Sequence, residues 1–295
     1  MVASVQRQTL GRSRGAGEKL RGKLFTATLV LATGLAIASL LVLIGTVADR
    51  GLGVIDAGFL RNFASRIPAR AGIWPPLVGT VYLMGLVMAF SFPLGVGAAI
   101  YLEEFAPRNR FTSAIETNIA NLAAVPSIIY GLLGLAIFYR GIGLGRSLLT
   151  GALTLTLLVL PIVIIASREA LRAVPRSIRL GALALGATEW EAVYRQVLPV
   201  AMPGILTGTI LGLSRAIGET APLLVAGAAA FVAFTPDHLL DAYSALPIQI
   251  FDWVRRPQPD FQDLAAGAIL VLLVVLISVN AVALLIRNRF ERPTR

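Results

Sequence analysis

Six long apolar segments constrain this chain more than any other feature of its sequence. A helix needs about 20 mostly apolar residues to cross about 30 Å of hydrocarbon, whereas a barrel strand needs only about 9–11. Six runs have the length of a helix and are separated by charged clusters, Gly or Pro: 25–47, 76–102, 117–139, 147–167, 203–231 and 264–286. Helices satisfy their own backbone hydrogen bonds in lipid. The sequence therefore predicts an all-α polytopic membrane protein with six transmembrane helices.

The composition agrees with a membrane protein and excludes several kinds of site. Hydrophobic residues make up 56% of the 295 residues and charged residues 14%, against about 45–50% and about 25% in soluble domains. With no cysteine and one histidine, His238, the chain has no disulfide and no Cys- or His-rich metal site. Its two lysines, Lys19 and Lys23, are each followed by Leu, which excludes a Walker A loop. Any ATP hydrolysis would take place on another subunit.

The basic residues predict the orientation of the spans. Four segments on one side hold 17 Lys/Arg: 1–24, 103–116, 168–202 and 287–295. Three segments on the other side hold 8: 48–75, 140–146 and 232–263. The positive-inside rule then places both termini in the cytoplasm. Because the net charge of +10 follows topology instead of forming one patch, no nucleic-acid partner is expected.

These boundaries also predict how the chain is organised. A basic cytoplasmic tail (1–24) precedes the first helix (25–47), which we interpret as an uncleaved signal anchor. The other five helices form one transmembrane domain over 76–286, and a second basic cytoplasmic tail follows over 287–295.

Two ionisable residues lie within the six predicted spans, and both lie in the fifth. Arg215 and Glu219 flank the midpoint of 203–231 and, four residues apart, share one face of a helix. Charges at this depth are costly and usually mark a substrate or proton path; a structural ion pair between helices is the alternative. Thr220 adds a hydroxyl, and Pro222 removes a backbone hydrogen bond one turn later.

Two further features of the spans concern packing and the pathway. Pro126 and Ser127 lie near the middle of the third span, where proline exposes polar backbone beside a hydroxyl. We therefore predict a substrate pathway that contains Arg215, Glu219, Thr220, Pro126 and Ser127. Gly204, Gly208 and Gly212 form a ridge of small residues that predicts close packing against another helix, of this chain or of a partner subunit.

The loop 168–202 is predicted to dock on a partner. Trp190, Val193, Tyr194, Val197 and Leu198 have the spacing of the apolar face of a helix, which Leu198–Pro199 is expected to end. An acidic polar face favours docking into a partner's groove over a helix lying in the lipid interface.

This loop and three other segments carry a family resemblance. Gly186–Ala187 followed by Leu198–Pro199 resembles the "EAA" loop of ABC importer permeases, with Leu180 in place of the glutamate and Gln196 in place of an isoleucine. The other segments are IYLEEF at 100–105, NLAAVPSIIYG at 121–131 and RAIGETAPLL at 215–224. Together they are similar to the A-type permeases of phosphate-specific ABC importers, and the Thr-Ala-Pro ending at 220–222 distinguishes the A-type from the C-type permease.

The resemblance implies a type I ABC importer permease fold in the cytoplasmic (inner) membrane of a bacterium. It implies that this chain translocates inorganic phosphate beside a C-type permease, an ATPase dimer that binds ATP and Mg, and an external phosphate-binding protein. This chain would bind no cofactor itself. The ATPase contact would be made by six residues: Gly186, Ala187, Glu189, Trp190, Leu198 and Pro199.

Other functions remain open from the residues alone. Molybdate or sulfate is the second choice of substrate, and a passive anion channel with Arg215 as its selectivity site is a second class of transporter. An intramembrane enzyme that uses Glu219 as an acid or base would need more converging polar groups than the spans contain.

Overall fold

A computed structural model describes residues 16–229 and 231–290. Most of the predicted tail 1–24 and the end of the tail 287–295 lie outside these residues. The chain forms two compact units, Met1–Asp49 and Arg50–Arg295. The first contains most of helix α1 (Ala16–Gly51), which overlaps a candidate membrane span, Arg21–Val54, that includes the predicted segment 25–47.

The second unit is helical throughout its regular elements in the described residues. Its α-helices follow in chain order: α2 (Ala57–Arg61), α3 (Trp74–Ile100), α4 (Arg110–Ala123), α5 (Ser127–Gly134), α6 (Leu148–Arg172), α7 (Arg176–Ala184), α8 (Glu189–Ala192), α9 (Leu198–Ile217), α10 (Ala221–Ala226), α11 (Leu246–Val254) and α12 (Pro259–Phe290). Short 3-10 turns are η1 (Leu52–Val54) and η2 (Pro68–Arg70), and π-helical turns are η3 (Tyr101–Phe105), η4 (Leu135–Gly141) and η5 (Val193–Val197).

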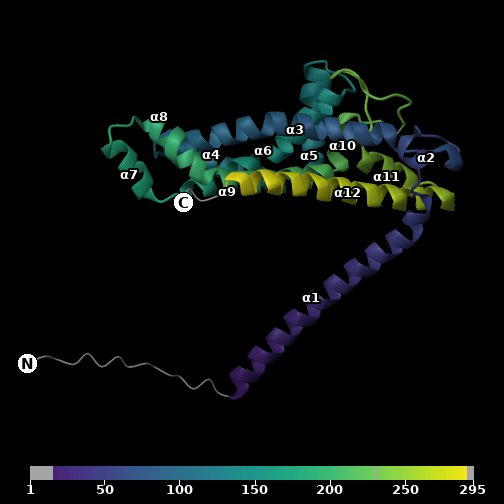
Figure 1. The fold of residues 1–295 in the computed structure, drawn as a ribbon, viewed down its shortest axis with the longest axis horizontal. Coiled ribbons are helices and arrows are strands. Elements are labelled where there is room, and N and C mark those ends of the chain that lie inside the picture. Colours follow the sequence, from purple (N-terminus) through teal and green to yellow (C-terminus); the bar gives the residue numbers. More distant parts are fainter. Residues whose placement is uncertain (1–15, 230, 291–295) are drawn as a thin grey trace, which may run out of the picture. The chain divides into compact units, whose positions relative to one another are not determined.

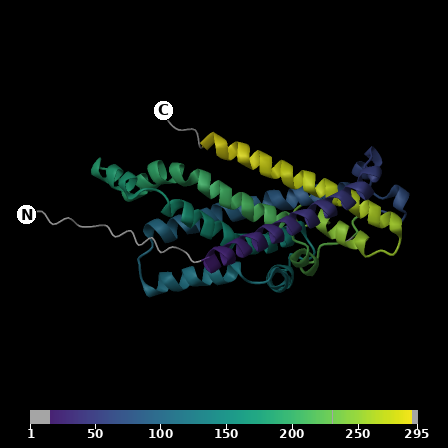
Figure 2. The same cartoon turned by 90° about the horizontal axis from the view of Figure 1, so that it is seen from below.

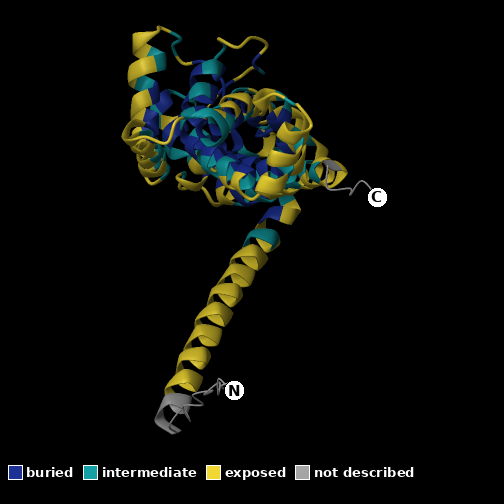
Figure 3. Ribbon diagram, turned by 90° about the vertical axis from the view of Figure 1, so that its left-hand side faces the viewer, coloured by how far each residue is buried: buried dark blue, intermediate teal, exposed yellow. Residues whose placement is uncertain are grey.

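Helix α6 forms the centre of the bundle and packs against both α3 and α9. Its side chains Leu155, Val159 and Val163 are fully buried, and buried residues collect inside the second unit while exposed ones cover its outside (Figure 3). Helix α12 runs along one side of the bundle next to α9 (Figures 1 and 2). There the Ser214 hydroxyl donates a hydrogen bond of 2.6 Å to Oδ1 of Asn280.

The glycine ridge of α9 packs against α6 of the same chain. A Cβ atom on Gly204 would lie 2.7 Å from Cβ of Ala170, and one on Gly212 would lie 3.0 Å from Cγ1 of Val159. A Cβ atom on Gly208 would overlap Cβ of Ala166. The prediction that the ridge packs against a helix is therefore confirmed, and that helix is α6 instead of a partner permease.

Replacing Gly208 with Leu should consequently destabilise the fold of the chain. Overpacking of this kind costs about 1–3 kcal/mol, so we expect the thermal unfolding temperature of the purified protein to fall by several degrees. The matched control is Gly85→Leu, because nothing lies within 4 Å of a Cβ atom at Gly85. Equal unfolding temperatures for the two variants would contradict the observed packing.

Within residues 16–229 and 231–290, five helices are long and apolar enough to cross a membrane, or six if one sharply bent pair is counted as a span. The bent pair corresponds to the predicted third span. Segment 117–139 is not one helix: α4 ends at Ala123, a new helix begins at Ser127, and the two axes differ by 103°. Pro126 explains the break, because a proline disfavours helical geometry at the residue before it and has no N–H to donate.

The predicted fifth span, 203–231, also has the wrong boundaries. Helical structure runs without a gap from Glu189 to Ile217 and then stops until Ala221. The expectation that Leu198–Pro199 ends a helix is wrong, because a π turn precedes this proline and the Leu198 N–H bonds the Val193 carbonyl. The wider turn makes room for the ring of Pro199, which would otherwise press on the preceding turn.

The two ends of the bundle carry different elements (Figure 1). Helices α7 and α8 and the C-terminal end of α12 lie at one end, and α2 and α11 lie at the other. The basic loop 168–202 is thus at the same end as the last turn of α12, which contains Arg287 and Arg289. This arrangement agrees with the shared side that the charge count predicts for these segments.

Candidate functional site

The predicted pathway residues lie in or beside two chain breaks, and the short helices that follow these breaks pack against each other. Helix α5 begins after the first break and α10 after the second, and the two helices lie side by side within the bundle (Figure 1). Gly131 of α5 allows this approach: a Cβ atom there would lie 2.8 Å from Cα of Pro222 and 2.9 Å from Cβ of Val225. Residues about 90 positions apart in sequence thereby meet inside the bundle.

The Arg215–Glu219 pair lies at the end of α9 and not on a continuous helix. Nε of Arg215 is 3.3 Å from Oε1 of Glu219, and the side chains are 48% and 16% exposed. The chain turns out of the helix immediately after Ile217, since the Gly218 N–H bonds the Arg215 carbonyl and the Glu219 N–H bonds the Ala216 carbonyl. The ion pair therefore lies at a partly exposed end of α9, where the Glu219 carboxylate contacts only part of the Arg215 guanidinium.

The first break is held by a tyrosine from the helix that follows it. The Tyr130 hydroxyl donates a 2.8 Å hydrogen bond to the Leu122 carbonyl, across the bend between α4 and α5. Pro126 is exposed and Ser127 is half-buried. In the described part of the chain, no hydrogen bond joins Ser127 to Arg215 or Glu219, so their shared role in a pathway stays a prediction.

The residues predicted to contact an ATPase lie at the end of the bundle with α7 and α8. Gly186 follows α7 with a φ of +86°. The Gly186 N–H bonds the Leu183 carbonyl and the Ala187 N–H bonds the Ala182 carbonyl, which is the Schellman ending of a helix. Thr188 then begins α8 with a capping box that includes Glu191. A tight, hydrogen-bonded turn therefore fixes α7 relative to α8.

The amphipathic pattern over this segment is divided between two environments. Val193 and Val197 are buried in the bundle, whereas Trp190 and Tyr194 are about 60% exposed. The Trp190 ring stacks on Tyr194 at 6.1 Å and lies 6.0 Å from Phe105. Only the aromatic part of the predicted apolar face is thus available to a partner. Glu189 is also exposed, Pro199 is exposed, and Ala187 and Leu198 are half-buried.

Two features of this end were not predicted from the sequence. The side chain of Leu180 in α7 is 65% exposed and that of Leu185 at the C-cap is 91% exposed. Because Leu180 stands in place of the EAA glutamate, this position is part of an apolar surface. Glu103 and Glu104 also form ion pairs with arginines of α6 and α7. The signal for these ion pairs in the sequence is the two adjacent glutamates directly after an apolar run. The predicted span 76–102 ends immediately before them.

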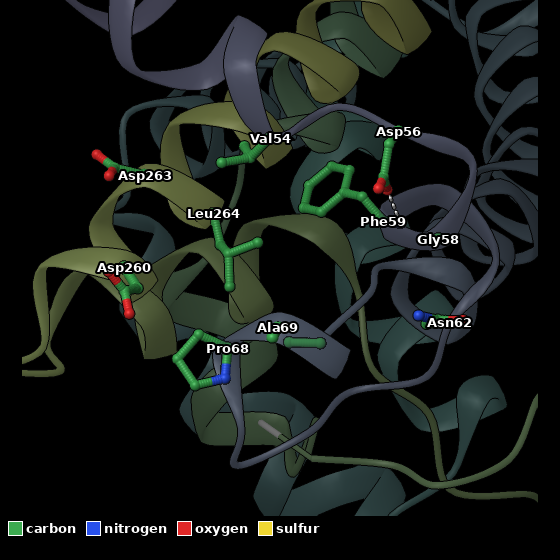
Figure 4. Close-up of a pocket in the computed structure, with 11 residues that line it drawn as sticks. Val54, Asp56, Gly58, Phe59, Asn62, Pro68, Ala69, Asp260, Asp263 and Leu264 are labelled. Carbon is green, nitrogen blue, oxygen red and sulfur yellow. Dashed lines mark hydrogen bonds between the residues drawn. The ribbon is translucent and has the colours of Figure 1, made fainter.

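A cavity of about 370 Å³ opens at the opposite end of the bundle (Figure 4). Its lining includes Asp56, Asp260 and Asp263 together with Phe59 and Asn62. Oδ1 of Asp56 accepts a 2.6 Å hydrogen bond from the Phe59 N–H and so caps α2. Three carboxylates would repel an anion, and the described residues contain no cluster of acids, His or Cys suited to a metal ion. This cavity is therefore unsuited to binding an anion.

Comparisons with known proteins agree with this architecture. A family model described as "Binding-protein-dependent transport system inner membrane component" matches residues 91–295. The chain is 35% identical over 206 residues to "Probable ABC transporter permease protein YqgI" of Bacillus subtilis, covering 70% of each chain. It is 34% identical over 228 residues to "Phosphate transport system permease protein PstA 1" of Mycobacterium tuberculosis, covering 76% of this chain and 72% of that protein.

A more distant relative is matched over more of the chain. The chain is 30% identical over 260 residues to "Probable phosphate transport system permease protein PstA" of Methanocaldococcus jannaschii, covering 88% of this chain and 91% of that protein.

Solved structures share the fold at low sequence identity. A bacterial alginate ABC transporter in complex with alginate pentasaccharide-bound periplasmic protein gives a TM-score of 0.67 at 15% identity, covering 95% of this chain and 99% of that chain. The MetNI methionine ABC transporter gives 0.57 at 17% identity, covering 75% and 95%. With a family model over more than half of its length and relatives of at least 30% identity, the chain belongs to the inner membrane components of binding-protein-dependent transport systems, and it is an ABC transporter permease, not an enzyme.

Proposed function

We propose that this permease translocates inorganic phosphate across the membrane in an ATP-driven importer. The observation that carries the proposal is the similarity, at 30–34% identity over most of the chain, to several permeases named for phosphate transport. A half-exposed guanidinium at a helix end is chemically suited to the substrate, because its planar fork binds phosphate oxygens and stays charged at any physiological pH.

The proposed importer needs subunits other than this chain. Because this chain has no Walker A loop, transport depends on a separate ATPase dimer that holds ATP and Mg. The surface that contains Leu180, Leu185, Trp190 and Tyr194 is where we place the ATPase, since these apolar side chains lie at one end of the bundle. A second, C-type permease and an external phosphate-binding protein complete the importer.

The orientation is part of the same proposal. The α7–α8 end of the bundle faces the cytoplasm of a bacterium across its inner membrane, and the end with α2 and α11 faces the binding protein. Both chain termini are then cytoplasmic, in accordance with the positive-inside rule.

The function is tested by uptake of radioactive phosphate into vesicles that contain the four kinds of subunit. Uptake should require ATP and should be competed by unlabelled phosphate but not by equal concentrations of molybdate or sulfate. Competition by molybdate or sulfate alone would assign another oxyanion. Uptake that continues without the ATPase would instead indicate a passive channel.

Gly186→Val tests the turn that presents α7 to the ATPase. A left-handed conformation costs a residue with a Cβ atom about 1–2 kcal/mol, and nothing lies within 4 Å of a Cβ atom here, so the strain is in the backbone alone. We expect phosphate uptake to fall about 5- to 30-fold while the protein still inserts. Gly186→Asn is the control, because asparagine tolerates this conformation; equal uptake by both variants would contradict the role of the turn.

A further inference from the structure

Two adjacent glutamates at the end of α3 reach different helices. The π turn η3 continues α3 and contains Glu103 and Glu104, and it ends with the Ala106 N–H bonded to the Tyr101 carbonyl at 2.8 Å. π turns of this kind are frequent at functional sites. Both carboxylates are mostly removed from solvent, with 14% of the Glu103 side chain and 7% of the Glu104 side chain exposed.

Glu103 connects α3 to the bundle itself. Its oxygens accept hydrogen bonds from Nε and Nη2 of Arg172, at 3.2 Å and 3.0 Å, and from Nη2 of Arg168 at 3.3 Å. Arg168 also lies 2.7 Å from Oε1 of Glu116 in α4. These groups line a polar cavity of about 490 Å³. Glu103 therefore belongs to a network that joins α3, α4 and α6.

Glu104 instead connects α3 to α7. It accepts hydrogen bonds from Nε and Nη2 of Arg179, the Nε bond being 2.9 Å to Oε2. Nη2 of Arg179 also bonds the Leu171 carbonyl and Nη1 bonds the Val174 carbonyl, each at 2.9 Å, where α6 ends. The hydrogen bond to Glu104 raises the pKa of Arg179 above its ordinary value. One guanidinium thus holds the ends of α3 and α6 and the body of α7 together.

Apart from this anchor and the hydrogen-bonded turn that joins it to α8, helix α7 has few contacts that fix its position. None of its residues is buried, and Ile178 is the residue of α7 that packs, partly buried, on the main core. Its leucines Leu180 and Leu183 face outward and are 65% and 41% exposed. A helix with an exposed apolar face and few packed side chains depends on its polar anchor for a fixed position.

We propose that Glu104 is a positioning residue that fixes α7 to the end of α3 through Arg179, so that a displacement of α7 is transmitted to α3. Glu103 holds α3 to α4 and α6 independently. The inference rests on the proposed function in one respect, because the ATPase is the partner that would displace α7. The anchor itself follows from the geometry of the single chain.

The first test measures ATP hydrolysed per phosphate imported by the assembled importer in vesicles. Glu104→Gln and Arg179→Gln should each raise this ratio at least about fivefold, because α7 then moves without α3. The double variant should be no worse than the stronger single variant, since either change alone breaks the link. Arg172→Gln is the matched control: this arginine pairs with Glu103 and is 52% exposed, and its ratio should stay within about twofold of wild type.

The results that overturn the proposal are equally specific. A wild-type ratio in either Gln variant, or a rise of the same size in Arg172→Gln, would remove Glu104 from this role. If the Gln variants do not assemble, Arg179→Lys provides the test, because lysine keeps the charge but cannot bond Glu104 and two carbonyls in one plane. We expect Arg179→Lys to give an intermediate ratio, and a wild-type ratio would contradict the proposal.

The second test does not depend on phosphate or on transport. Because the chain contains no cysteine, nitroxide labels can be attached to Ser177→Cys in α7 and Phe111→Cys in α4, both exposed. The distance between the labels should have one narrow distribution in the wild-type background and a clearly broader one with Arg179→Gln. An unchanged distribution would overturn the anchor. Failure of phosphate uptake in the wild-type importer would overturn only the proposed function.

Discussion

Arg215→Gln should lower phosphate uptake by about 10- to 100-fold in an assembled importer. A hydrogen bond between charged groups is worth about 1.5–3 kcal/mol, and each 1.4 kcal/mol is a factor of ten. The effect is expected to be large because the substitution removes the only cation of the pair and leaves Glu219, 3.3 Å from Nε of Arg215 in the wild type, to repel an anion. Initial rates of radioactive phosphate uptake at equal membrane levels of the complex measure it.

Glu219→Gln is the matched control at the same site. Arg215 keeps its charge in this variant, so uptake should fall less than in Arg215→Gln. Glu219 competes with the anion for the guanidinium, and it is also placed to accept a hydrogen bond from protonated phosphate. Because phosphate monoanion and dianion interconvert with a pKa of about 6–7, the pH dependence of uptake should change. If Arg215→Gln transports normally, the pair is a structural ion pair.

Gly131→Val should reduce uptake to less than about one tenth of wild type, because it separates α5 from α10, the helices that follow the two chain breaks. A Cβ atom at this position would lie 2.8 Å from Cα of Pro222, and a backbone atom cannot move without displacing α10. The overpacking should also destabilise the purified permease by about 1–3 kcal/mol. Uptake and thermal unfolding of the same preparation measure the two effects.

The control for this substitution is Gly97→Val in α3, since nothing lies within 4 Å of a Cβ atom at Gly97. It should leave both uptake and unfolding temperature near wild type. A Gly131→Val permease with normal uptake would mean that contact between α5 and α10 is not needed for the pathway.

The sequence predicts the long apolar helices well, because continuous apolar runs determine them. The runs at 76–102 and 264–286 lie inside the spans that contain α3 and α12, and the run 147–167 begins one residue before the span that contains α6. The glycine spacing in α9 predicts close packing, yet the choice of α6 as the neighbour depends on tertiary structure. Hydropathy also cannot show where a span bends, so Pro126 was recognised as unusual while the 103° bend after Ala123 was not.

The site could be predicted only in part for a related reason. Arg215 and Glu219 are recognisable because they are charges within an apolar run, but their place at a helix end depends on the break after Ile217. The π turn before Pro199 has no simple pattern, which led to a wrong helix end. The pair of Glu104 and Arg179 joins residues 75 positions apart, and such a partnership is visible only when the helices have been placed together.

The measurement that tests the central claim most directly is phosphate uptake by vesicles containing this chain, a C-type permease, the ATPase dimer and the phosphate-binding protein. Uptake should be abolished when ATP, the ATPase or this chain is omitted, and it should fall about 10- to 100-fold when Arg215→Gln replaces the wild-type chain. Phosphate uptake that persists without ATP, or an importer that accumulates another oxyanion and not phosphate, would contradict the account.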